Sequence, residues 1–261
     1  MGHLRLGRLY KSRKWVEVID LLDHDDLSVP QISAATVRAA EKELLKLGTN
    51  PVLNYCFWLL VHITTSAKNN KLKSQLEQIG IKPDQISTTF TLISSLGDVI
   101  RNKSTEYDEI NIFSEITNLT FRQTLTETIA SQPKSLFGSS FEDIQNACSS
   151  YSSEKQFGLL ARKFFSNLLS RSFTYFINKE LSNHIGPEHV LANTESAIQF
   201  NNALNNYSYL TSKIVEDFAG GWYSKHNWET GGRISEEESL KFIAYALKKL
   251  RMELESEGVN S

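Results

Sequence analysis

The chain has 261 residues and a formal net charge of −2, with 22% charged and 40% hydrophobic residues. This balance is ordinary for a folded soluble protein, and the small net charge excludes a global field that would indicate a nucleic-acid or membrane partner. The length allows one large core or two small ones.

The first third of the sequence predicts three helices. Apolar residues from Trp15 to Leu22 recur at helical spacing and predict a short first helix. After an interruption by Pro30, Ser33 is the expected N-cap of a second helix that ends at Gly48. Asn50-Pro51 predicts the start of a third helix, which is apolar nearly all round and is therefore expected at the centre of the fold.

The second half shows stronger helical patterns. We expect helices over Glu154–His184 and over about Thr194–Phe218, and a last helix that begins with a Ser235/Glu238 capping box. An apolar seam at three- and four-residue steps follows that box: Leu240, Ile243, Leu247, Leu250 and Leu254. Such a seam is more often an intramolecular bundle contact than an oligomer contact.

No run of alternating β-branched residues with hairpin glycines occurs, so the sequence predicts an all-α fold. The architecture we expect is an irregular multi-helix bundle or a helical-repeat-like array. An N-terminal half (residues 1–130) and a C-terminal half (residues 141–261) are expected to share one continuous core.

The cysteines and the apolar segments predict a cytoplasmic protein. Cys56 and Cys148 both lie in apolar helical patterns, which favours two buried thiols in a reducing compartment over a disulfide. No secretory segment is recognisable, and the longest apolar run, Val52–Ile63, is too short to cross a bilayer. We therefore expect no membrane association.

The most informative segment runs from Ile214 to Trp228, where a helical pattern meets Gly220-Gly221 and then a group of aromatic residues. We interpret the glycines as the end of a helix and the start of a flexible segment closed by Gly231-Gly232. The expected partner-binding residues are Trp222, Tyr223, Lys225, His226 and Trp228, because aromatic side chains carry much of the binding energy at protein interfaces. The competing interpretation places Trp222 and Trp228 as plugs in the core, and one ring could point inward while the other points outward.

Nucleic-acid binding is an alternative hypothesis. The N-terminal basic residues expected to contact phosphates are Arg5, Arg8, Lys11, Arg13 and Lys14, and Tyr10 and Trp15 between them could stack on bases. Lys248, Lys249 and Arg251 form a second small basic patch. No known docking motif accompanies these residues.

Catalysis is a second alternative. If the chain folds back after Gly220-Gly221, Glu216 or Asp217 could approach His226 and form the acid–base pair of an unrecognised hydrolase or nuclease. A metal site at His184 and His189 is disfavoured because the two residues straddle a helix end. We predict no metal and no cofactor.

The sequence therefore predicts a non-catalytic accessory or scaffold subunit of a cytoplasmic multi-protein complex. Its partner would be another protein, with an ATPase or a nuclease subunit of a genome-maintenance or defence system as a candidate. Self-association into a homo-oligomer is a further option for the same surfaces.

Overall fold

The computed structural model describes residues 12–22, 28–131, 140–181 and 193–260. In chain order the helices are α1 (Arg13–Leu22), α2 (Val29–Ala39), α3 (Glu41–Leu47), α4 (Pro51–Lys68), α5 (Leu72–Gln78), the 3-10 helix η1 (Pro83–Gln85), α6 (Thr89–Glu106), α7 (Ile112–Glu127), α8 (Phe141–Ser149), α9 (Glu154–Leu181), α10 (Thr194–Thr211), α11 (Lys213–Thr230) and α12 (Glu236–Asn260). The described residues contain no strand, and the all-α prediction is confirmed.

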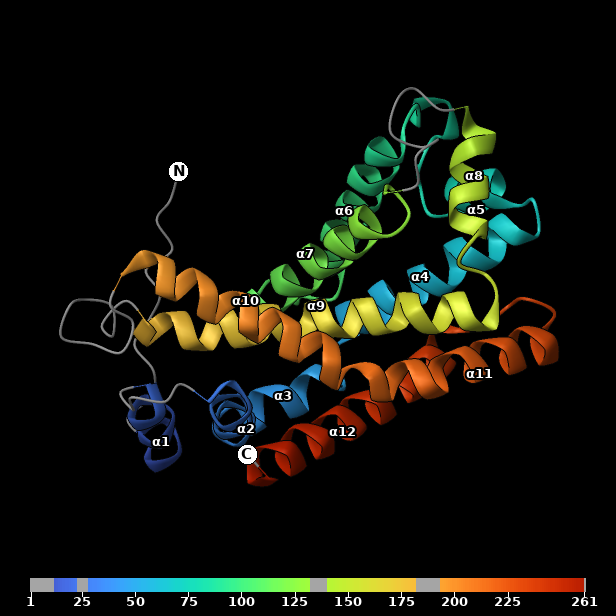
Figure 1. Ribbon diagram of the computed structural model, residues 1–261. Coiled ribbons are helices and arrows are strands. Elements are labelled where there is room, and N and C mark those ends of the chain that lie inside the picture. Colours follow the sequence, from blue (N-terminus) through green and yellow to red (C-terminus); the bar gives the residue numbers. More distant parts are fainter. Residues whose placement is uncertain (1–11, 23–27, 132–139, 182–192, 261) are drawn as a thin grey trace.

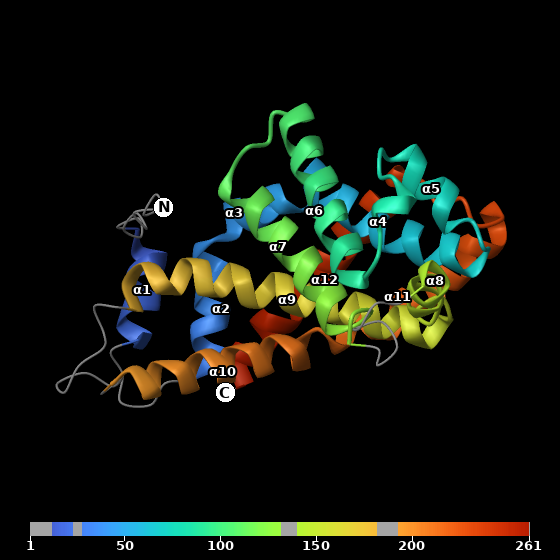
Figure 2. The ribbon, with the colours of Figure 1, turned by 90° about the horizontal axis from the view of Figure 1, so that it is seen from above.

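Two helices organise the bundle. The long helix α9 packs against α11, α10 and α7, and it runs between the α6–α7 pair and the α10–α12 group in Figure 1. Figure 2, viewed from above, shows α9 and α10 running side by side. Helix α4 lies at the centre as the sequence predicts, since fourteen of its 18 residues are buried and it contacts α8, α12 and α7.

Phe57 of α4 lies at the centre of an aromatic cluster that joins distant parts of the chain. Its ring stacks on Phe242 of α12 with centroids 4.8 Å apart, and it also contacts Phe157, Phe165 and Trp222. The main buried cluster extends from Leu22 to Leu254, so helices on both sides of residues 131–140 contribute to it. The proposed division into two halves stays a prediction, because the junction at residues 132–139 lies outside the described residues.

Two of the three predicted N-terminal helix caps are confirmed, those at Asn50 and at Ser235. The Asn50 side chain accepts hydrogen bonds from the first backbone amides of α4, and Pro51 is its first residue. Ser235 and Glu238 form the reciprocal capping box ahead of α12. Ser33 is not an N-cap: α2 begins at Val29 with Ser28 as its cap, because Pro30 fits in the first turn, where no amide hydrogen is needed.

The apolar seam of α12 is intramolecular. Ile243, Leu250 and Leu254 are buried, and α12 packs against α2, α4 and α11. Cys56 and Cys148 are buried free thiols, as predicted. None of the described helices is both long and apolar enough to cross a membrane.

Candidate functional site

The aromatic segment is helical throughout, so the prediction of a flexible hinge at Gly220-Gly221 is wrong. Instead, the expected helix over Thr194–Phe218 breaks at Ser212, where α10 ends, and α11 continues through both glycines to Thr230. The Ser212 hydroxyl bonds the carbonyl of Ser208, a contact that competes with regular helix geometry.

Gly220 is required by close packing between two helices. A Cβ atom at this position would lie 2.3 Å from the backbone oxygen of Glu154, at the start of α9. Gly158 of α9 meets α11 in the same way, with a Cβ placed 3.0 Å from the backbone oxygen of Glu216. These glycines let the backbones of α11 and α9 lie closer together than a side chain at either position would allow.

Tyr223 is a core residue, so its expected role in partner binding is wrong. Only 2% of the residue is exposed, and its ring stacks on Phe157 with centroids 3.9 Å apart. The hydroxyl groups of Tyr223 and Thr65 share a hydrogen bond of 2.9 Å, and burial raises the pKa of the Tyr223 phenol. The side chain therefore anchors α11 to α4.

Trp222 and His226 lie at the edge of the core. The half-buried Trp222 ring contacts Phe242 with centroids 4.5 Å apart, and the His226 ring lies 5.0 Å from it. The Nδ1 atom of His226 is 2.8 Å from the backbone oxygen of Trp222, within the same helix. Both side chains retain partial exposure, but packing fixes them.

Trp228 and Lys225 point outward. Trp228 is 85% exposed, the highest value among the large hydrophobic residues described, and the Lys225 ammonium pairs with Glu229 at 3.8 Å on the surface. The predicted segment thus divides into an anchor, formed by Trp222 and Tyr223, and an exposed end around Trp228.

The end of α11 leads into a pocket of about 740 Å³ between α4, α5 and the loop before α12. Gly231 and Gly232 both have positive φ angles, of 62° and 82°, which glycine adopts without strain, and both line this pocket. The indole Nε1 of Trp58 donates a hydrogen bond of 3.1 Å to the carbonyl of Ile234 and so ties the loop to α4.

His62 lies in the same pocket and stacks on Trp58 with ring centroids 4.5 Å apart. Burial lowers the pKa of His62 below its ordinary value, while a hydrogen bond to Gln75 acts in the opposite direction. The imidazole is therefore neutral at neutral pH. Sequence reasoning missed Trp58 and His62 as site residues; the signal was a histidine inside the apolar run Val52–Ile63, four residues after a tryptophan.

The proposed acid–base pair is not formed. Glu216 and His226 are ten residues apart on one continuous helix, which separates them by about 15 Å along its axis. Glu216 instead pairs with Arg162 at 2.8 Å, and Asp217 pairs with Lys213. The fold-back that would bring a carboxylate to His226 does not exist, because the glycines are helical.

The basic residues of the nucleic-acid hypothesis are only partly described. Arg5, Arg8 and Lys11, together with Tyr10, lie outside the described residues, as do His184 and His189. Arg13 is exposed at the start of α1, and Lys14 pairs with Glu41 at 3.2 Å.

The stacking part of that hypothesis is wrong for Trp15. Trp15 is 3% exposed and packs on Phe176, so its ring is not available to a base. In the second basic patch, Arg251 is paired with Glu41 and Glu255. Within the described residues, no group of three or more His, Cys, Asp or Glu side chains could hold a metal ion.

Comparisons of the chain with protein-family models, curated proteins and solved structures find no match.

Proposed function

We propose that the protein is a non-catalytic subunit that binds another protein through the exposed end of α11. The observation that carries this proposal is Trp228, which is 85% exposed on a helix whose preceding turns are fixed in the core. An exposed indole on a rigid support gains free energy when a partner buries it and loses little conformational entropy in doing so.

The surroundings of Trp228 support a protein partner. Gly231 and Gly232, one turn further along, line the 740 Å³ pocket that also holds the Trp58–His62 stack. A projecting aromatic residue next to a concave surface with polar and aromatic walls resembles the centre of a protein interface, with Lys225 and Glu229 as a polar rim. The two buried thiols fit the proposed cytoplasmic setting.

The test compares two exposed apolar residues. The full chain, purified from its native host with bound proteins, should retain a stoichiometric partner, which is then purified separately. Trp228→Ala should weaken binding of that partner by about 30-fold, corresponding to about 2 kcal/mol for a central interface tryptophan. Leu210→Ala, a change at a 65% exposed position on α10, is the matched control and should leave the affinity unchanged.

Two outcomes would reject the proposal. One is a partner that binds the Trp228→Ala and Leu210→Ala variants equally well. The other is a chain that remains monomeric by light scattering and retains no other protein. Self-association that Trp228→Ala abolishes would identify a second copy of the chain as the partner at the same surface.

A further inference from the structure

A second concave site lies along α9, between α7 and α10. Its volume is about 400 Å³, and its walls come from Gln123 of α7, from Arg171, Thr174 and Asn178 of α9, and from Asn205 of α10. Among the described residues, the lining combines one guanidinium with amides and hydroxyls, together with Ile116 and Tyr175, and none of these side chains is a carboxylate. This composition is typical of a site for an anionic group.

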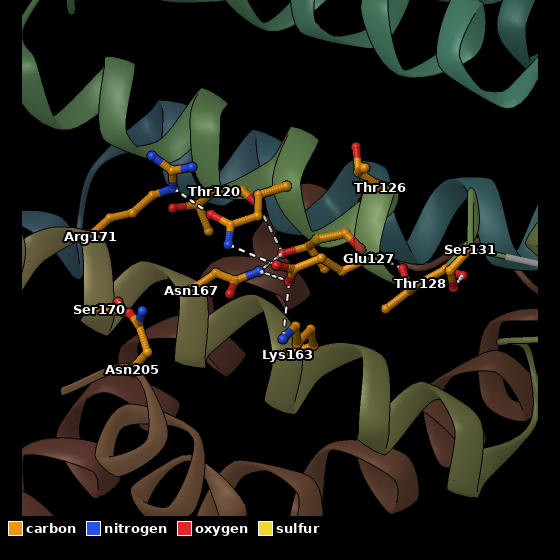
Figure 3. Close-up of polar contacts among 12 residues, drawn as sticks. Thr120, Thr126, Glu127, Thr128, Ser131, Lys163, Asn167, Ser170, Arg171 and Asn205 are labelled. Carbon is orange, nitrogen blue, oxygen red and sulfur yellow. Dashed lines mark hydrogen bonds and ion pairs between the residues drawn. The ribbon is translucent and has the colours of Figure 1, made fainter. Parts of the chain in front are cut away.

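The orientation of Arg171 is fixed by a chain of polar contacts (Figure 3). Its Nε donates to the Gln123 side-chain oxygen at 2.8 Å, and the Gln123 amide nitrogen donates to Glu127 at 2.9 Å. The second oxygen of Glu127 pairs with Lys163 at 3.0 Å and accepts from Asn167 at 3.1 Å. The nearby carboxylate is thus already neutralised by Lys163.

Arg171 therefore carries a positive charge that the described part of the chain does not pair with an acid. Burial lowers the pKa of its guanidinium from the ordinary value, and the more distant Glu127 only partly opposes this effect. Half-burying a cation without an anion is costly, and a bound anion would remove that cost. Because arginine stays protonated in proteins, the charge persists at any physiological pH.

We propose that this groove binds the phosphate or carboxylate group of a small polar molecule, with Arg171 as its ionic anchor. The contact to Gln123 occupies Nε, and no other described side chain engages the terminal nitrogens Nη1 and Nη2, which can form two parallel hydrogen bonds to an oxyanion. In Figure 3, Asn205 lies with Ser170 on the α10 side of α9, and its side-chain oxygen accepts from the Ser170 hydroxyl. The side-chain amide nitrogen of Asn205 remains as a hydrogen-bond donor for the ligand.

The size of the groove favours a small molecule over a macromolecular segment. Its volume of about 400 Å³ exceeds what a single phosphate ion fills and falls within the range of small-molecule sites. The hydroxyl and amide groups of Thr174 and Asn178 suit the hydroxyl groups of a sugar or a hydroxy acid.

The test uses titration calorimetry on the full chain at constant ionic strength, with inorganic phosphate, ribose 5-phosphate and succinate as separate probes. At least one probe should bind, and the phosphate and succinate arms distinguish the two oxyanions. Arg171→Gln should reduce the affinity about tenfold or more, since a charge-assisted pair contributes about 1.5–3 kcal/mol. Asn178→Asp, which places a negative charge in the groove at almost unchanged size, should reduce it as well.

The control is Arg101→Gln, which removes an exposed arginine on α6 that pairs with Asp98 outside the groove. This variant should bind the probes like the unaltered protein. The proposal is overturned if no probe binds at about 1 mM, a concentration typical of weak substrate affinities. It is also overturned if Arg171→Gln and Asn178→Asp fold normally and bind the probes as tightly as the control.

Discussion

Because α11 and α9 are in close contact, we expect alanine substitutions at the adjacent Gly220 and Gly221 to have opposite effects on stability. Replacing Gly220 by alanine places a Cβ atom 2.3 Å from the backbone oxygen of Glu154, whereas the same change at Gly221 meets its nearest atom, a Glu154 side-chain oxygen, at 4.0 Å. Both positions are in the interior of one helix, so both substitutions gain the same helix propensity. They differ only in what the added methyl group contacts.

The magnitudes follow from these distances. Alanine is favoured over glycine in a helix by about 1 kcal/mol, which is the whole effect expected for Gly221→Ala. Overpacking a close contact costs about 1–3 kcal/mol, and at Gly220 the upper end applies because the obstructing atom belongs to a backbone and cannot rotate away. Gly220→Ala should therefore destabilise the protein by about 2 kcal/mol net. The two variants should differ by about 3 kcal/mol.

Chemical denaturation with urea measures this difference directly, and thermal unfolding gives a second measure. For a chain of this size, 1 kcal/mol corresponds to roughly 2–4 °C in Tm, so the two variants should melt roughly 6–12 °C apart. If Gly220→Ala is as stable as Gly221→Ala, then α11 can move away from α9 without cost, and the account of the glycines as a packing requirement is wrong.

Two further predictions concern buried titratable groups. The pKa of His62, followed by NMR, should lie below 6.5. The free energy of unfolding should then fall as pH drops from 6.5 through the folded pKa, because in that range only the unfolded chain binds the proton. The His62→Gln variant should lack this contribution to the slope, and a folded pKa above 6.5 would contradict the burial argument. Burial raises the pKa of Cys56, and raises that of Cys148 to about 12, so iodoacetamide should label neither thiol in the native protein and both in denaturant, as mass spectrometry can show. Rapid labelling of the native protein would refute this.

The sequence predicts the helical class and several helix ends because these depend on neighbouring residues. The cap at Asn50-Pro51 and the Ser235/Glu238 box need only a few residues to form, and both are present. The end of α10 at Ser212 is different, because hydroxyl contacts to the preceding turn have no strong sequence signature.

The candidate site could be predicted only in part. Gly220 looks like a helix end in isolation, because its reason for being glycine is the backbone of Glu154, more than sixty residues away. If a helix is extended through Gly220, the spacing of Val215, Ala219 and Tyr223 marks its buried face. Trp228 then lies outside that buried face. The pocket around His62 needed the loop before α12, which no local pattern places beside α4.

The covering of α4 has a consequence for biosynthesis. This helix leaves the ribosome early, yet the rings that shield Phe57, from Trp222 and Phe242, are translated more than 160 residues later. Until α11 and α12 emerge, the nascent chain exposes one of its most apolar surfaces, and such delayed long-range pairing slows folding and invites aggregation. We therefore expect truncated chains lacking the last two helices to depend on chaperones.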